Sequence, residues 1–194
     1  MVGVRDGGVD GNERLTATTA VVLVLLLAAL GVTILSIRPL IWWHVLLGML
    51  LIPPILLKLG STGWRFVRHY AGAPEYVRRG PPLLPLRLLA PLVVAATLAV
   101  FGTGVALLVV GPGGGFLVGL HKASFVVWLV VTAVHVLAHV RHLLPPVRAV
   151  PGAHGRRLLL AGSIVAGAVL AIATVRYAQP WVHWFAANHH HGDG

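Results

Sequence analysis

Five apolar runs constrain this chain more than any other feature, because each is close to the length of a membrane-spanning helix. The hydrocarbon core of a bilayer is about 30 Å thick, so a helix needs about 20 residues to cross it. The runs cover residues 18–37, 40–57, 88–110, 116–140 and 158–175. We therefore expect an all-α integral membrane bundle of five transmembrane helices over residues 18–176.

The composition points the same way. Of the 194 residues, 57% are hydrophobic and only 10% are charged, and the mean hydropathy is +0.87. A soluble domain carries about 25% charged residues. The sequence has no cysteine, which excludes disulfides, iron–sulfur clusters and thiolate metal sites.

The chain is strongly basic, with 15 lysines and arginines against 5 acidic residues. The basic residues flank the apolar runs, so a membrane explains them better than a nucleic-acid partner does. If the N-terminus is cytoplasmic, all of them except Arg38, Lys122 and Arg176 fall on the inner side. The positive-inside rule then predicts a multi-pass plasma-membrane protein with a cytoplasmic segment 1–17 and an extracytoplasmic tail 177–194.

Histidines lie in or at the edge of two of the apolar runs, whereas no acidic residue lies in any run. These histidines are His44, His121, His135 and His139. Proton relays and ion-coupled transporters normally need a buried carboxylate, and carboxylates are common ligands in zinc and di-iron sites. The pattern argues against those classes and favours haem, which needs only neutral imidazoles in an apolar slot.

The spacing of the histidines supports this hypothesis. His121 and His135 are 14 residues apart, or about 21 Å along a helix and about 40° around it. One helix face can thus serve two stacked haems, and His139 shares that face. His44 lies near the outer end of its run, as His121 does, so these two are expected at one depth.

Three further residues have expected roles beside the same haem. Gly48, one turn from His44, would let a flat macrocycle approach the backbone. Lys122, and also Arg38, would neutralise haem propionates at the outer surface.

Residues 40–143 resemble the bacterial transmembrane b-type cytochromes, the membrane subunits of formate dehydrogenases and nickel–iron hydrogenases. The resemblance rests on the spacing and depth of His44, His121 and His135. It implies a four-helix core with two b haems, in which a late helix supplies one histidine to each haem. It also implies that His44, on an earlier helix, is the second ligand of the outer haem, and that the fifth span is extra to the core.

The sequence departs from this pattern at the inner haem, because the first and third spans contain no histidine. Lys58 lies 14 residues after His44 but would have to be deprotonated. His69 becomes a partner for His135 or His139 only if "GSTG", residues 60–63, breaks the helix and folds it back. His142 is the remaining neighbour. We therefore expect one haem and leave the second open.

The leading functional hypothesis is an electron-transfer subunit of an oxidoreductase complex, rather than a stand-alone enzyme. It would pass electrons between a quinone and an extracytoplasmic or membrane-bound redox partner. The alternative is a non-redox membrane protein, either an assembly factor or a permease that handles metals through histidines.

Simpler interpretations of the histidines also remain at this point. His44 and His121 would be interfacial residues bonded to water, and His135 would bond a carbonyl of a neighbouring helix. His183 and the terminal run 189–191 would bind copper or zinc, or belong to an unstructured tail.

Overall fold

The computed structural model describes residues 8–78, 84–139 and 153–188, and every regular element in these ranges is helical. Five helices are long and apolar enough to cross a membrane. They are α1 (Gly8–Leu35), α2 (Ile37–Tyr70), α4 (Leu84–Val110), α5 (Gly115–His139) and α6 (Ala153–Thr174). Three short elements complete the fold: α3 (Pro74–Val77), the 3₁₀ helix η2 (Val175–Ala178) and α7 (Gln179–Ala187). The prediction of an all-α membrane bundle is confirmed.

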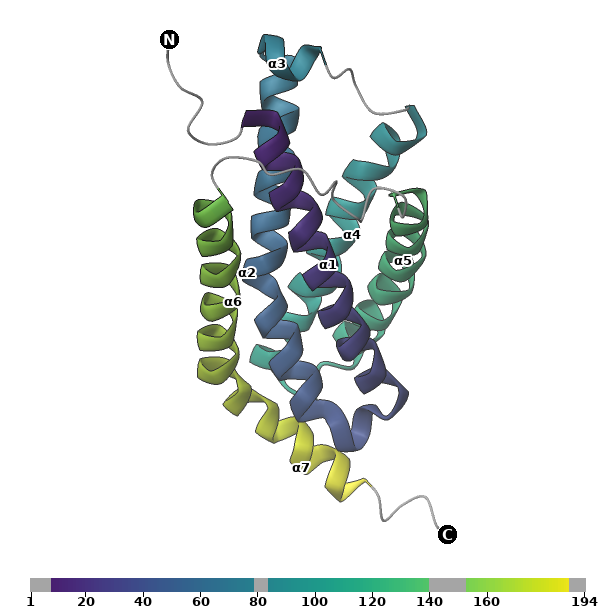
Figure 1. Ribbon diagram of the computed structural model, residues 1–194. Coiled ribbons are helices and arrows are strands. Elements are labelled where there is room, and N and C mark those ends of the chain that lie inside the picture. The colour runs from purple at the N-terminus through teal and green to yellow at the C-terminus, as the bar shows by residue number, and fades with distance from the viewer. Residues whose placement is uncertain (1–7, 79–83, 140–152, 189–194) are drawn as a thin grey trace.

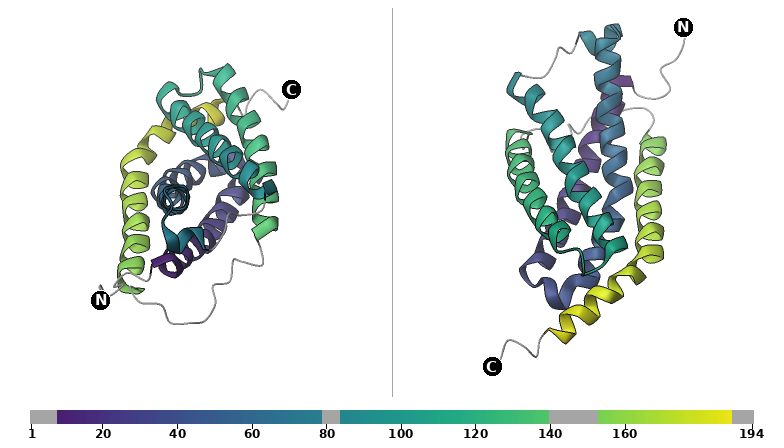
Figure 2. Two further views of the ribbon diagram at one scale, coloured as in Figure 1. Left: turned by 90° about the horizontal axis from the view of Figure 1, so that it is seen from above. Right: turned by 180° about the vertical axis from the view of Figure 1, so that it is seen from behind.

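Helix α2 is the central element of the bundle. Seen from above, it is surrounded by α6, by α1 and by the antiparallel pair of α4 and α5 (Figure 2). It packs extensively on α1 and α6, whereas its contact with α4 is slight. The bundle thus consists of two parts, α1–α2–α6 and α4–α5, which meet along a thin interface.

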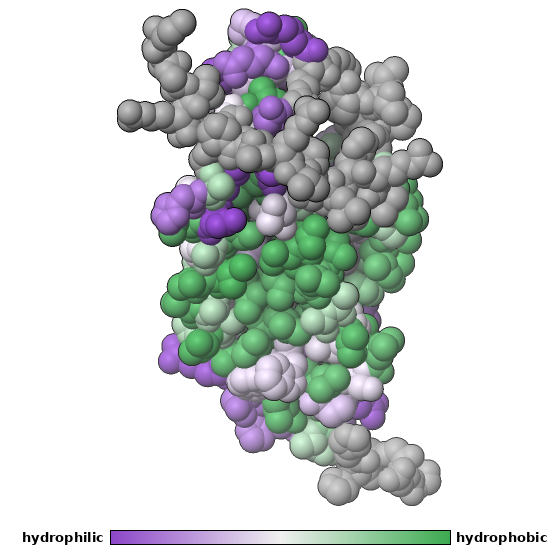
Figure 3. Space-filling view, in the orientation of Figure 1, coloured by the Kyte–Doolittle hydropathy of each residue, from purple (hydrophilic) through white to green (hydrophobic). Residues whose placement is uncertain are grey.

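The surface agrees with a membrane location. An apolar belt covers the middle of the bundle on the face in Figure 3, with hydrophilic residues toward both ends. Large apolar side chains such as Val126, Val130 and Val169 are exposed in these central segments. Helix α1 begins at one end of the bundle and α7 ends at the other (Figure 1).

Two helix boundaries differ from the sequence prediction. Helix α1 begins at Gly8 rather than at residue 18, and α2 continues to Tyr70 instead of ending at residue 57. The break at residues 60–63 that His69 would need does not occur, and α2 also continues through Pro53 and Pro54. It ends only before Gly72, whose φ of 77° is a backbone conformation that suits glycine.

A polar seam between α1 and α2 explains these longer helices. Lys58 Nζ donates to the carbonyl of Thr16 (2.9 Å), and the hydroxyls of Thr16 and Ser61 lie 3.0 Å apart. One turn further out, Asn12 Nδ2 donates to the carbonyl of Ser61 (3.0 Å). Polar residues that look like loop in the sequence therefore satisfy one another between the two helices.

The close approach of α2 and α6 depends on Gly167. A Cβ atom at this position would collide with the backbone carbonyl of Leu50 on α2. Small residues let membrane helices approach one another closely, which strengthens their van der Waals contact. Val45, Met49 and Ala171 form the buried cluster beside this contact.

Helices α4 and α5 are joined by a hydrogen bond inside the apolar belt. Trp128 Nε1 donates to Thr97 Oγ1 (3.1 Å), and the Thr97 hydroxyl donates to the carbonyl of Val93 (2.7 Å). We expect Trp128→Phe to destabilise the protein by about 0.6 kcal/mol, the average for hydrogen bonds between membrane helices. Reversible denaturation in mixed micelles measures this loss. Trp43→Phe, at an exposed tryptophan, should change little, and equal effects at both sites would contradict the role of the bond.

As far as residue 188, the segment after α6 has regular structure and is not an unstructured tail. Helix α7 crosses the base of the bundle (Figure 1), and Trp181 is buried there. Its Nε1 donates to the carbonyl of Leu107 at the end of α4 (3.3 Å). Trp181 therefore links α7 to the α4–α5 part of the bundle. The histidine run 189–191 lies outside the described residues.

Candidate functional site

The structure brings His44 and His121 together at one end of the bundle. His44 lies near the start of α2 and His121 near the start of α5, and both helices begin at the lower end in Figure 1. Both side chains are half-buried. Two imidazoles from different parts of the bundle thus lie at the same end, each about two turns from the start of its helix.

A threonine of α1 orients His44. Its Nδ1 lies 2.8 Å from Thr33 Oγ1, and the Thr33 hydroxyl donates to the carbonyl of Leu30. Since the hydroxyl hydrogen is already used, the oxygen accepts a hydrogen bond from Nδ1–H of His44. This tautomer, assigned from the hydrogen-bond network, leaves the lone pair on Nε2.

A threonine of α4 holds His121 in the same manner. His121 Nδ1 lies 3.0 Å from Thr103 Oγ1, and the Thr103 hydroxyl donates to the carbonyl of Ala99 (2.7 Å). Ser124 Oγ is 3.3 Å from the same hydroxyl. The ring also lies against Gly104, where an added Cβ would come within 3.2 Å of Cε1. His121 therefore also carries its proton on Nδ1 and its lone pair on Nε2.

The two histidines share one hydrogen-bonding arrangement, with Nδ1 bonded to a threonine and Nε2 left without a partner in the described chain. Ligating histidines usually donate their other ring N–H to a fixed acceptor, which sets the tautomer and the ring orientation. Within the described part of the chain, neither Nε2 atom makes a hydrogen bond. His44 and His121 thus offer two neutral imidazole nitrogens in an apolar setting.

The number of side chains that could ligate a metal limits which kind of metal centre this site could hold. Among the described residues, no group of three or more His, Cys, Asp or Glu side chains could hold a metal ion. A catalytic zinc site uses three protein ligands and a structural one uses four. A haem iron needs only two, because the porphyrin supplies the other four. Two imidazoles therefore fit haem better than a bare ion.

A largely apolar cavity of about 330 Å³ lies between α2 and α4. Its lining is formed by Ile52, Ile55, Leu56, Leu59, Thr97, Leu98, Phe101, Gly102 and Val105. Neither His44 nor His121 is among these residues, so the cavity lies along the α2–α4 interface and not at the two rings. Cβ atoms added at Gly48 on α2 and Gly102 on α4 would meet nothing within 4 Å.

The structure does not bring the histidines considered for an inner haem together into a pair of ligands within the described residues. His135 is half-buried on α5. The side chain of His139 and the whole of His142 lie outside what the structure describes. His69 is 25 residues from His44 along one continuous helix, or about 37 Å, so α2 does not bring it to the level of His135. Instead, His69 Nδ1 lies 3.2 Å from the carbonyl of Tyr76.

The predicted cationic residues have distinct surroundings. Lys122 is exposed next to His121. Lys58 is taken up by the polar seam, where its amine donates to the Thr16 carbonyl. Arg38 is exposed and lies at a second cavity, between α2 and α7.

Sequence reasoning missed the two threonines that orient the rings. Thr33 and Thr103 are hydroxyl residues inside otherwise apolar segments, which is a signal that could have been used. Their pairing with His44 and His121 depends on how α1 packs on α2 and how α4 packs on α5. Neither packing is visible in the spacing along one helix.

Comparison of the chain with protein-family models, with curated proteins and with solved structures gives no match. An argument about function must therefore come from the site itself.

Proposed function

We propose that this protein is a membrane-embedded b-type cytochrome. It would pass electrons between a quinone pool and an extracytoplasmic or membrane-bound oxidoreductase subunit. The observation that carries the proposal is the pair His44 and His121, from separate helices, each with Nδ1–H bonded to a threonine and Nε2 left to ligate. The resemblance to bacterial b-type cytochromes, which rests on the same histidines, adds to it.

In this proposal each residue has a definite task. His44 and His121 would hold the iron through Nε2, and Thr33 and Thr103 would fix the orientation of the two rings. The apolar walls of α2 and α4 exclude water, which helps set the potential. Haem, when bound, supplies reversible one-electron chemistry. Lys122 would neutralise a propionate.

The orientation in the membrane is part of the same proposal. The bias of lysine and arginine puts the start of α1 in the cytoplasm, so the His44–His121 end faces outward in the plasma membrane. One haem at this end is what we propose. A second haem, held by His135 or His139, would need another ligand. The continuous α2 carries His69 out of reach, and Lys58 and His142 remain the predictions from sequence.

A redox difference spectrum tests the function. Protein purified after expression with ample haem should give a reduced-minus-oxidised spectrum with Soret and α bands typical of bis-imidazole haem. A short-chain quinol should produce the reduced spectrum without dithionite. A colourless protein would favour the alternative of an assembly factor or metal-handling permease, and haem that no quinol reduces would contradict the quinone part.

Thr103→Val tests whether the threonines position the ligands. Valine keeps the shape but removes the acceptor for His121 Nδ1–H, so we expect haem affinity to fall about 10-fold to 100-fold and the midpoint potential to shift. Redox titration and haem retention on dilution measure these effects. Thr174→Val is the matched control, because that hydroxyl bonds only carbonyls of its own helix, at Leu170 and Ala171. Equal behaviour of the two variants would show that Thr103 has no positioning role.

A further inference from the structure

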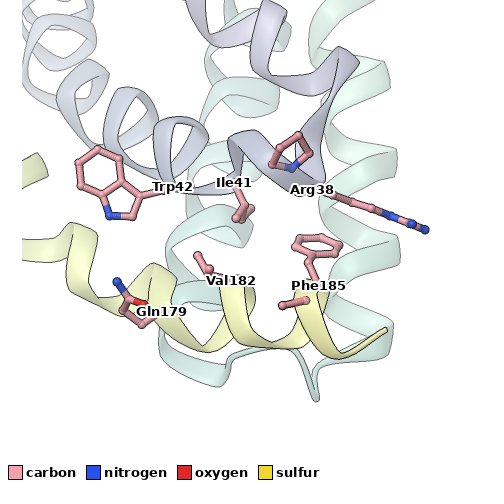
Figure 4. A pocket seen from close by; sticks show the side chains of 8 residues that line it. Arg38, Ile41, Trp42, Gln179, Val182 and Phe185 are labelled. Atoms are coloured by element: carbon pink, nitrogen blue, oxygen red, sulfur yellow. The ribbon is translucent and has the colours of Figure 1, made fainter. Parts of the chain in front are cut away.

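A second cavity, of about 360 Å³, lies at the same end of the bundle and is separate from the histidine site. It is formed where α7 crosses the beginning of α2. Val182 and Phe185 of α7 point toward Ile41 of α2, while the Arg38 side chain starts at the cavity and its guanidinium extends outward, away from these residues (Figure 4). The cavity therefore has an apolar interior and a cationic edge.

The acidic residues of the described ranges all lie at the end of the protein away from the cavity. The acidic residues in the described ranges, Asp10, Glu13 and Glu75, belong to α1 and α3 at the other end. The end with the cavity carries Arg38, Lys122 and Arg176. Within the described ranges, Arg38 makes neither an ion pair nor a hydrogen bond. An anion brought to this rim would meet a positive charge that no carboxylate of the described chain neutralises.

The position of the cavity indicates where such an anion comes from. Helix α7 carries the exposed Trp184, and tryptophan collects at the boundary between hydrocarbon and headgroups. With Trp184 at this boundary, the apolar interior would lie at the depth of the upper acyl chain, and Arg38 at the depth of the lipid phosphate.

We propose that this α2–α7 cavity is a binding site for an anionic phospholipid, with the phosphate at Arg38 and the glycerol and upper acyl chain against Ile41, Val182 and Phe185. A neutral quinone would gain nothing from the net positive charge at this end. The proposal does not depend on haem, since neither His44 nor His121 lines the cavity.

Quenching by brominated lipid tests the site, because Trp42 lines the cavity. Intact protein is placed in nanodiscs with brominated phosphatidylglycerol or brominated phosphatidylcholine at equal mole fraction. The part of the quenching that Trp42→Phe removes should be larger with phosphatidylglycerol. One arginine near an anionic headgroup contributes about fivefold in affinity, so Arg38→Gln should reduce the preference by about that factor.

Arg176→Gln is the matched control, since it removes a charge from the same end but outside the cavity. It should keep the preference for phosphatidylglycerol. Equal quenching by the two lipids in the unmodified protein, or an equal loss in both variants, would overturn the proposal and indicate only a general layer of surrounding lipid. Displacement of brominated phosphatidylglycerol by a short-chain quinone at low occupancy would overturn it in favour of a quinone site.

Discussion

His44→Ala should remove the haem from the outer end of the bundle, with near-complete loss of its Soret absorbance. The variant loses one of two axial nitrogens, and an alanine methyl group cannot replace it. His121→Ala should give the same result, because in the proposed site the two rings would hold one iron between separate helices. Absorbance per mole of purified chain measures the loss.

An exposed histidine at the same end provides the control. His183 lies on α7 with its side chain exposed, and His183→Ala should keep the full haem content. Circular dichroism and gel filtration of all three variants separate loss of a ligand from loss of the fold. If folded His44→Ala retains all its haem, the pairing of His44 with His121 is wrong.

Gly167→Ala should cause the largest loss of stability among single-methyl changes in the described helices. The new Cβ would meet the Leu50 carbonyl oxygen and would lie 3.1 Å from the carbonyl carbon. Backbone atoms cannot rotate away as a side chain can, so α6 must separate from α2. Overpacking of this kind costs about 1–3 kcal/mol, and Gly167→Val should cost more. Denaturation in mixed micelles measures both.

Gly162→Ala is the matched control on the same helix. An added Cβ there meets nothing within 4 Å, so its stability should be unchanged or slightly raised by the better helix propensity of alanine. Equal behaviour of Gly162→Ala and Gly167→Ala would contradict the close contact between α2 and α6.

The fold class could be predicted because it depends on the length and apolar character of whole segments. The helix ends could not, because the continuation of α2 depends on a partner. Residues 58–70 look like a loop until α1 is placed beside them, and then Lys58 and Ser61 bond to Thr16 and Asn12. Because of the same packing, α2 does not break at residues 60–63.

For the candidate site, too, one part could be predicted from the sequence and another part could not. The depth of His44 and of His121 follows from counting residues along two spans. Their orientation does not, because it depends on Thr33 and Thr103, which lie on neighbouring helices. His69 is a candidate for the inner haem only if the helix breaks before it, and without that break it lies too far along α2.

The haem content of the purified, unmodified protein tests the central claim most directly. Pyridine haemochrome absorbance, divided by the protein concentration from amino-acid analysis, gives the number of b haems per chain. We expect at least one, and a value close to one if only the His44–His121 end is occupied. A value near zero in folded protein from haem-replete cells would contradict the account.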